Sequence, residues 1–113
     1  MNDCIFCRIA NGEISTEKVF ENDNMVIVKD INPQAKVHLL IIPKKHFENL
    51  EDASKEDPTL VAALFHDFAE IAPTLGLNEG YRFVSNKGKF GCQSVEHLHI
   101  HVLGGEQLSE KMS

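Results

Sequence analysis

The segment His97-Leu98-His99-Ile100-His101-Val102 carries the strongest signal in the chain for both fold and chemistry. Side chains on a strand alternate between its two faces. The three histidines therefore share one face, and the three aliphatic residues share the other, where they can pack beneath a helix. We predict a strand over residues 95–103, ended by Gly104-Gly105, that separates a chemical face from a core face.

The upstream elements follow from apolar periodicity and turn residues. Residues 4–10 predict a short helix that ends at a glycine, since glycine suits a helix C-terminus. Residues 18–21 and 25–29 predict two strands that form a hairpin. The nearly continuous apolar run 37–42 predicts a strand that is buried on both faces.

One long helix is predicted to cover the sheet. Asp57 caps it, Pro58 occupies its first position and Gly76 stops it. Residues 81–85 predict the remaining strand. Short connections favour antiparallel pairing, so the expected class is α+β: a mostly antiparallel five-stranded sheet covered by the long helix and a short N-terminal helix. The apolar stripe of the long helix comprises Leu60, Val61, Leu64, Phe65, Phe68, Ile71, Ala72 and Leu75.

Length and composition bound the class of protein. A chain of 113 residues, with 42% hydrophobic and 25% charged residues, is expected to form one globular domain, residues 1–113. The net charge of −6 argues against general binding to a nucleic-acid polymer. No apolar run approaches the roughly 20 residues of a membrane-spanning helix. No signal peptide is visible, and three cysteines are too few for a disulfide scaffold, so a cytoplasmic location is expected.

Three interpretations compete for the histidine triplet. A run of half-exposed histidines without a role is improbable for three in-phase histidines. A three-histidine metal site conflicts with geometry, because His97 and His101 would lie about 13 Å apart on a strand, whereas zinc–nitrogen bonds measure about 2.0–2.1 Å. We favour the third interpretation, an anion-handling site with one nucleophilic histidine and a neighbouring proton carrier, because imidazole is a competent nucleophile at neutral pH.

The loop before the triplet supports this interpretation. It reads Asn86-Lys87-Gly88-Lys89-Phe90-Gly91-Cys92-Gln93-Ser94. Glycines let a backbone turn its N–H groups toward an anion, and Asn86, Gln93 and Ser94 add neutral hydrogen-bond groups. Alone, such a loop is more typical of a hairpin. Followed directly by three histidines, it indicates a phosphate-sized cradle.

Cys4-Ile5-Phe6-Cys7 is a separate signal. A redox pair would be expected to follow a strand, which this pair does not. Two unrelated buried cysteines and half of a tetrahedral zinc site remain, and Cys-x-x-Cys is the usual first half of such a site. Among the other histidines, His66 is expected to be solvated. His38, in the buried strand, is expected to bond a backbone carbonyl rather than to act as a ligand.

Together these motifs resemble the histidine triad (HIT) superfamily, in which histidines alternate with hydrophobic residues. The ending His101-Val102-Leu103-Gly104-Gly105 is similar to the HINT branch, and the resemblance runs from about Cys4 to Gly105. The other matching positions are His97 to Ile100, Gln93-Ser94-Val95, Asn86, Gly88, Gly91, Ile41-Ile42-Pro43-Lys44-Lys45-His46 and Asp30-Ile31-Asn32-Pro33-Gln34.

The resemblance implies hydrolysis of purine nucleoside phosphoramidates or related nucleotidyl substrates, with release of a nucleoside monophosphate. His99 would attack phosphorus and form a nucleotidyl-histidine intermediate that water hydrolyses, so the chemistry needs no cofactor. His101 and Ser94 match positions that bind phosphate and assist the leaving group, and Asp30 matches the residue that binds the ribose hydroxyls. The alternative is a nucleotide-binding, zinc-stabilised interaction module with little turnover.

The remaining nucleotide-binding positions divide into two groups. Five apolar residues match a slot for the base, although from the residues alone they are more typical of ordinary core. The base group is Ile5, Phe6, Ile9, Val28 and Ile31, and the phosphate group is Asn86, Gln93 and the backbone around Cys92 and Val95.

A structural zinc ion is expected at Cys4, Cys7, His46 and His97, a ligand set that some bacterial HIT proteins carry. His46 follows the buried strand and His97 begins the triplet strand, so the two imidazoles converge if those strands are neighbours. The resemblance also implies a homodimer through the long helix and the strand 81–85. Because the chain has no apolar run of membrane-spanning length, no membrane partner is expected. Cys92 departs from the family, which usually has Gly or Ala there, and the tail after residue 105 is also divergent.

Overall fold

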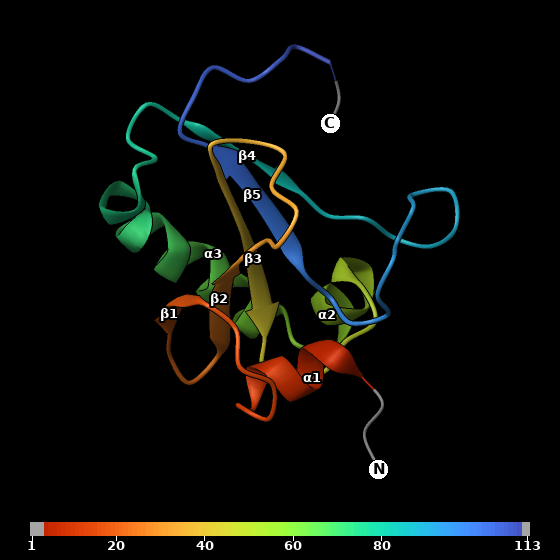
Figure 1. Ribbon diagram of the computed structural model, residues 1–113. Coiled ribbons are helices and arrows are strands. Elements are labelled where there is room, and N and C mark those ends of the chain that lie inside the picture. Colours follow the sequence, from red (N-terminus) through yellow and green to blue (C-terminus); the bar gives the residue numbers. More distant parts are fainter. Residues whose placement is uncertain (1–3, 112–113) are drawn as a thin grey trace.

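A five-stranded antiparallel sheet organises the computed structural model, which describes residues 4–111 (Figure 1). Its strands are β1 (Lys18–Glu21), β2 (Met25–Lys29), β3 (Val37–Pro43), β4 (Tyr81–Val84) and β5 (Ile100–Gly104). The spatial order is β1-β2-β3-β5-β4, and every neighbouring pair is antiparallel. The α+β fold predicted from the sequence is therefore confirmed, and β3 and β5 are neighbours at its centre.

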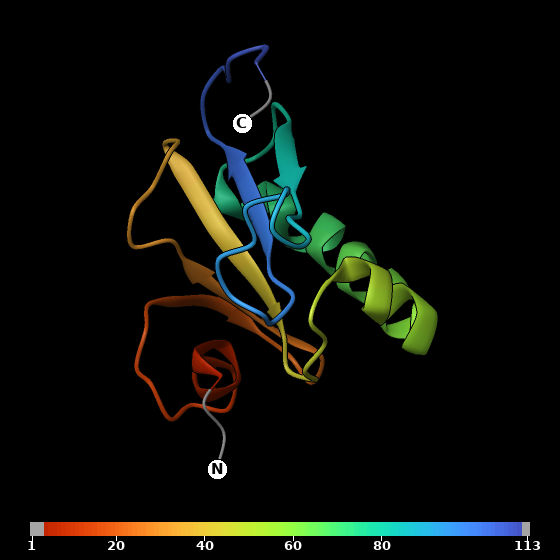
Figure 2. The same cartoon turned by 90° about the vertical axis from the view of Figure 1, so that its right-hand side faces the viewer.

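Helices cover both faces of this sheet. α3 (Pro58–Ile71) continues into a 3₁₀ turn, η1 (Ala72–Leu75), and packs on one face, while α1 (Ile5–Ala10) lies on the other (Figure 2). A further helix, α2 (Leu50–Glu56), directly precedes α3. Within residues 4–111 no helix has both the length and the apolar character that a membrane crossing needs.

The helix predictions were right about α1 and the start of α3, and wrong in two places. Asp57 caps α3 as predicted, but the α-helix ends at Ile71 rather than at residue 75. The reason is Pro73, which has no N–H to continue the helical hydrogen bonds. α2 was not predicted at all, although its cap follows the usual rule: the side-chain oxygen of Asn49 accepts the N–H of Asp52 at 2.9 Å.

The last strand is shorter than predicted. β5 begins at Ile100 instead of residue 95, because Pro43, which would stand opposite Leu98 on β3, has no N–H to extend the ladder. The N–H of Leu98 instead donates to the carbonyl of Phe47 at 2.7 Å. His97 and His99 therefore lie on irregular backbone, and only His101 lies in the ladder. The predicted strand 81–85 also ends one residue early, at Val84.

The core forms on both faces of β3, as the apolar run predicts. Leu39 and Ile41 join the buried cluster beneath α3, and Leu40 and Ile42 join the cluster beneath α1. Full burial of such a side chain contributes about 1.5–3 kcal/mol. The central strand β3 is thus packed on both faces, and His101 lies on the neighbouring strand β5, which is paired with it.

Candidate functional site

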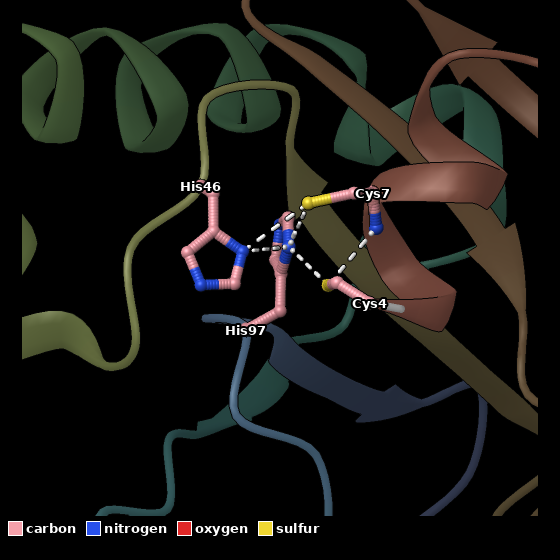
Figure 3. A group of neighbouring side chains, drawn as sticks. All are labelled: Cys4, Cys7, His46 and His97. Carbon is pink, nitrogen blue, oxygen red and sulfur yellow. Dashed lines mark hydrogen bonds between the residues drawn. The ribbon is translucent and has the colours of Figure 1, made fainter. Parts of the chain in front are cut away.

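Four side chains from three parts of the chain converge at the end of α1 (Figure 3). Cys4 is the N-cap residue of α1 and Cys7 lies in its first turn, His46 comes from the loop after β3, and His97 from the segment before β5. Cys4 Sγ lies 3.1 Å and Cys7 Sγ 3.3 Å from His97 Nδ1, and His46 Nδ1 lies 3.2 Å from Cys7 Sγ and 3.1 Å from His97 Nδ1. The structure therefore brings the four expected metal ligands together.

These spacings fit a tetrahedral metal. With zinc–nitrogen bonds of about 2.0–2.1 Å and zinc–sulfur bonds of about 2.3 Å, neighbouring ligand atoms lie roughly 3.3–3.6 Å apart, a few tenths of an ångström more than observed. The ring of His97 is also oriented for metal binding. It is fully buried, and its Nε2–H donates to the Pro43 carbonyl at 2.9 Å, which leaves the Nδ1 lone pair facing the cluster. Burial lowers the pKa of His97 and so favours its uncharged ring.

His99 carries the atom best suited to nucleophilic attack. Its ring Nδ1 lies 2.8 Å from the backbone carbonyl of His97, which only accepts hydrogen bonds, so the ring proton is on Nδ1. The Nε2 atom then keeps its lone pair. The ring is nearly buried, and Phe6 packs edge-on against it with ring centroids 4.8 Å apart. An oriented imidazole of this kind can form a covalent intermediate.

His101 has a second histidine as its partner. His38 Nε2 lies 2.9 Å from His101 Nδ1 and 3.3 Å from Asp30 Oδ2, and the N–H of Gln34 donates to His38 Nδ1 at 3.0 Å. The expectation that His38 bonds a backbone carbonyl is therefore wrong. Burial, followed by the nearby histidines, lowers the pKa of His101, while the charge of Asp30 acts in the opposite direction.

The loop between β4 and β5 is braced by its own side chains. The amide of Asn86 donates to the Gly91 carbonyl at 2.7 Å, and the side-chain oxygen of Gln93 accepts the N–H of Gly88 at 2.9 Å. The amide nitrogen of Gln93 donates to the Glu48 and Val95 carbonyls. The loop that is expected to bind phosphate is thus held in one conformation by hydrogen bonds within the protein, most of which involve the Gln93 side chain. Ser94 is exposed at its end.

A cavity of about 520 Å³ adjoins this loop. His38, Asn86 and His101 line it together, so the histidine pair and the loop border one space. The divergent tail lines the same cavity. It is held by the guanidinium of Arg82, which donates to the Ser109 carbonyl at 2.6 Å. The tail residues on the cavity wall are Leu108, Ser109 and Lys111.

The expected base-slot residues do not share one environment. Ile9 and Val28 are buried in the cluster beneath α1, as ordinary core residues are, and Phe6 packs against that cluster. Ile5 and Ile31 are exposed, Ile31 almost completely at 98%. The two exposed positions and Phe6 are therefore the ones that have surface left to offer a ligand.

Cys92 occupies strained backbone in the loop. Its φ of +59° lies in the left-handed region, which costs a residue with a Cβ about 1–2 kcal/mol. Glycine relieves this strain, but it loses more conformational entropy on folding than alanine does, which costs about 0.5–1 kcal/mol of stability. We expect Cys92→Gly to raise the free energy of unfolding by about 0.5–1 kcal/mol in urea titrations. Cys92→Ala is the control, and an equal gain there would assign the effect to the thiol.

Known proteins share the fold of this chain. A family model described as "Scavenger mRNA decapping enzyme C-term binding" matches residues 3–113. A solved histidine triad protein from Clostridium difficile superposes with a TM-score of 0.92 at 40% identity, covering 99% of this chain and 98% of that one. The chain belongs to the histidine triad (HIT) superfamily.

Other HIT superfamily relatives agree over nearly the whole length. Protein HitA of Neisseria gonorrhoeae is 47% identical over 104 residues, which is 92% of this chain and 97% of HitA. The crystal structure of a HIT family hydrolase from Legionella pneumophila has a TM-score of 0.89 at 44% identity, covering 96% of this chain and 97% of that one. In the HIT context, the triad is His97, His99 and His101, and the Cys4–Cys7 pair with two histidines fits a zinc site.

Proposed function

We propose that this HIT protein hydrolyses purine nucleoside phosphoramidates or related nucleotidyl substrates and releases a nucleoside monophosphate. The observation that carries the proposal is the orientation of His99. Its Nδ1–H is held by the His97 carbonyl at 2.8 Å, so a lone pair remains on Nε2 beside the ring of His101. The Legionella relative that bears the name hydrolase supports the general reaction class.

The proposed reaction has two balanced steps. In the first, a bond forms between His99 Nε2 and the α-phosphorus while the bond from phosphorus to the leaving nitrogen breaks, and the departing amine takes up one proton. In the second, water replaces His99 on phosphorus and one proton is released. The net consumption is one water, and the protein itself supplies the nucleophile.

The other site residues receive roles that suit their chemistry. The carboxylate of Asp30 accepts hydrogen bonds from the ribose hydroxyls, and the braced loop with Ser94 and His101 holds the phosphate. Phe6, with Ile5 and Ile31, offers apolar surface to the base.

Trapping the intermediate tests this proposal. The protein is mixed with an adenosine or guanosine phosphoramidate, quenched with acid-free denaturant and digested for mass spectrometry. We expect a nucleoside monophosphate adduct on His99 and a burst of free amine before steady state if hydrolysis is the slower step. An adduct on His97 or His101 would overturn the nucleophile assignment. Tight nucleotide binding with neither adduct nor turnover would favour the interaction module with little turnover.

We also propose that the four-residue cluster holds a structural zinc ion. Two thiolates and two imidazoles form a closed donor set with no position left for substrate. Zinc there would fasten α1 to the loop after β3 and to the segment before β5, and would keep His97 out of proton transfer. The cluster and the chemistry of His99 therefore have separate tasks.

A homodimer through β4 completes the proposal. β4 is an edge strand, and Phe83 on it is 40% exposed. Unpaired edges invite a second strand, so two copies could extend one another's sheet. Sedimentation velocity at micromolar concentration should show a dimer, and a monomer under those conditions would contradict the prediction.

A further inference from the structure

We propose that Cys4 and Cys7 form an oxidation site, at which a hydroperoxide converts the two metal-binding sulfurs into a reversible disulfide. The disulfide dismantles the four-residue cluster and loosens the first turn of α1. Its formation is a property of the chain itself, whereas its effect on turnover rests on the proposed function. The pair need not follow a strand for this role, because it is the target of an oxidant and not a catalyst of disulfide exchange.

The two sulfurs are placed so that they can be joined with little backbone movement. Cys4 is the N-cap residue of α1, and the N–H of Cys7, three positions later, donates to Cys4 Sγ at 3.2 Å. Both Sγ atoms lie against the same atom, His97 Nδ1, at 3.1 and 3.3 Å (Figure 3). Cα atoms three positions apart in a helix are about 5 Å apart, within the range of about 4.4–6.8 Å that disulfides span. Rotation about the two Cα–Cβ bonds therefore suffices to bring the sulfurs together.

An oxidant reaches this pair from the side of Cys7. Both cysteines are half-buried, and Cys7 also borders a cavity of about 450 Å³ that Lys18, Glu21 and Lys44 line from the sheet side. A cavity of this size admits hydrogen peroxide, since a water molecule takes up only about 30 Å³ in the liquid. Of the four cluster residues, all of which the structure describes, only Cys7 lines this cavity. The Cys7 sulfur is therefore the one attacked first.

The oxidation has two balanced steps. In the first, the Cys7 thiolate attacks one oxygen of hydrogen peroxide and the O–O bond breaks, which leaves a sulfenic acid on Cys7 and releases hydroxide. In the second, the Cys4 thiolate attacks the Cys7 sulfur, an S–S bond forms and the S–O bond breaks, with release of a second hydroxide. The two sulfurs lose two electrons together, and the peroxide is reduced to two waters after uptake of two protons.

A disulfide cannot hold the metal that the two thiolates would bind. Thiolate is the form of cysteine that ligates metal ions, and the disulfide has no thiolate left. A structural zinc site needs four ligands, whereas only the imidazoles of His46 and His97 remain after oxidation. Loss of both sulfurs therefore releases the metal, and reduction of the disulfide restores all four ligands.

The change is confined to the first turn of α1 and reaches the nucleophile through Phe6. Ile9 and Ala10 belong to the buried cluster on this face of the sheet, so packing holds the C-terminal half of the helix. Phe6 lies between the two cysteines in the sequence, and its ring packs edge-on against His99 with centroids 4.8 Å apart. A first turn that is released from the metal cluster no longer fixes Phe6 on that ring. We therefore expect lower turnover in an oxidised protein that remains folded.

Peptide mapping under non-reducing conditions tests the oxidation. Hydrogen peroxide is added in graded amounts to zinc-loaded Cys92→Ser, in which Cys4 and Cys7 are the only cysteines of the chain. We expect a Cys4–Cys7 disulfide, seen as a loss of two hydrogens, and release of about one zinc per chain in step with it. Dithiothreitol should reverse this change but not the gain of oxygen by methionine. Cys7→Ser added to Cys92→Ser is the matched control and should form no intramolecular disulfide.

Turnover of a nucleoside phosphoramidate completes the test. We expect kcat/KM of Cys92→Ser to fall at least about 10-fold on oxidation and to recover with dithiothreitol and zinc, because a misplacement of about 1 Å near the chemistry can cost about 10²-fold. Circular dichroism should show that the oxidised protein is folded. Unchanged kcat/KM in the disulfide form would overturn the link through Phe6.

Three results would overturn the oxidation site itself. They are thiols of the pair that survive a peroxide dose able to oxidise Cys92 of the parent, sulfinic acid on Cys7 without a disulfide, and zinc that stays bound to the disulfide form. A protein without phosphoramidase activity would refute the proposed function, and the peptide masses would still decide whether the disulfide forms.

Discussion

Replacement of His99 by alanine is expected to lower kcat on a nucleoside phosphoramidate by at least about 10³-fold and to abolish the covalent adduct. No neighbouring ring can take over its task. The Nδ1 of His101 contacts His38 Nε2 at 2.9 Å, and the Nδ1 of His97 faces the cysteine cluster. The measurement is steady-state turnover, with mass spectrometry after quenching.

The His99→Ala experiment needs proof that the fold survives. His99 is buried, so its removal leaves a small cavity, and circular dichroism with a urea titration should show a folded variant of lower stability. His66→Ala is the matched control, because His66 is an exposed histidine and should keep full turnover. Turnover in folded His99→Ala that equals the parent would refute the mechanism.

Loss of the metal is the second large effect that we expect. The purified protein should contain about one zinc per chain, whereas Cys7→Ser should contain little. The free energy of unfolding should fall by about 3 kcal/mol or more in Cys7→Ser, equivalent to a loss of roughly 10 °C or more in Tm. The serine is nearly isosteric and can still contact the imidazoles, so the loss reports the metal rather than packing.

The remaining cysteine supplies the control for this effect. Cys92 is exposed and lies outside the four-residue cluster, so Cys92→Ser should retain zinc and parental stability. A strong chelator added to the parent should reproduce the Cys7→Ser stability. If the parent contains no metal as purified and Cys7→Ser is equally stable, the cysteines are ordinary half-buried residues.

The elements with a long apolar pattern were predictable from the sequence. α3 shows a stripe at helical spacing and β3 a continuous apolar run, and both were placed within a few residues. α2 was missed because Ala53 is its only buried residue, so it has no apolar stripe to detect. Its signal was the cap, Asn49 followed by two acidic residues in the first turn.

The site was predictable where residue identity determines chemistry, and less so where it depends on backbone shape. The four candidate metal ligands were predicted from the Cys-x-x-Cys pair together with the resemblance to the HIT superfamily, and the structure brings them together. The strand assigned to His97 and His99 was wrong, since nothing in their spacing reveals that the ladder between β3 and β5 begins only at the Ile41–Ile100 pair. His38 was left out of the site. Knowledge of the β3–β5 register, with Leu40 opposite His101, would have placed it on the same face.

The wide sequence separation of the metal ligands has a consequence for how the protein is made. Cys4 and His97 are 93 positions apart, so these two candidate metal ligands leave the ribosome at different times. At about 5–20 residues per second, the interval is roughly 5–20 seconds. During that time the nascent chain presents a thiol pair whose coordination sphere is incomplete. We therefore expect all four ligands to bind zinc only after nearly the whole chain has been synthesised. Metal binding is then a late step in the folding of the new protein.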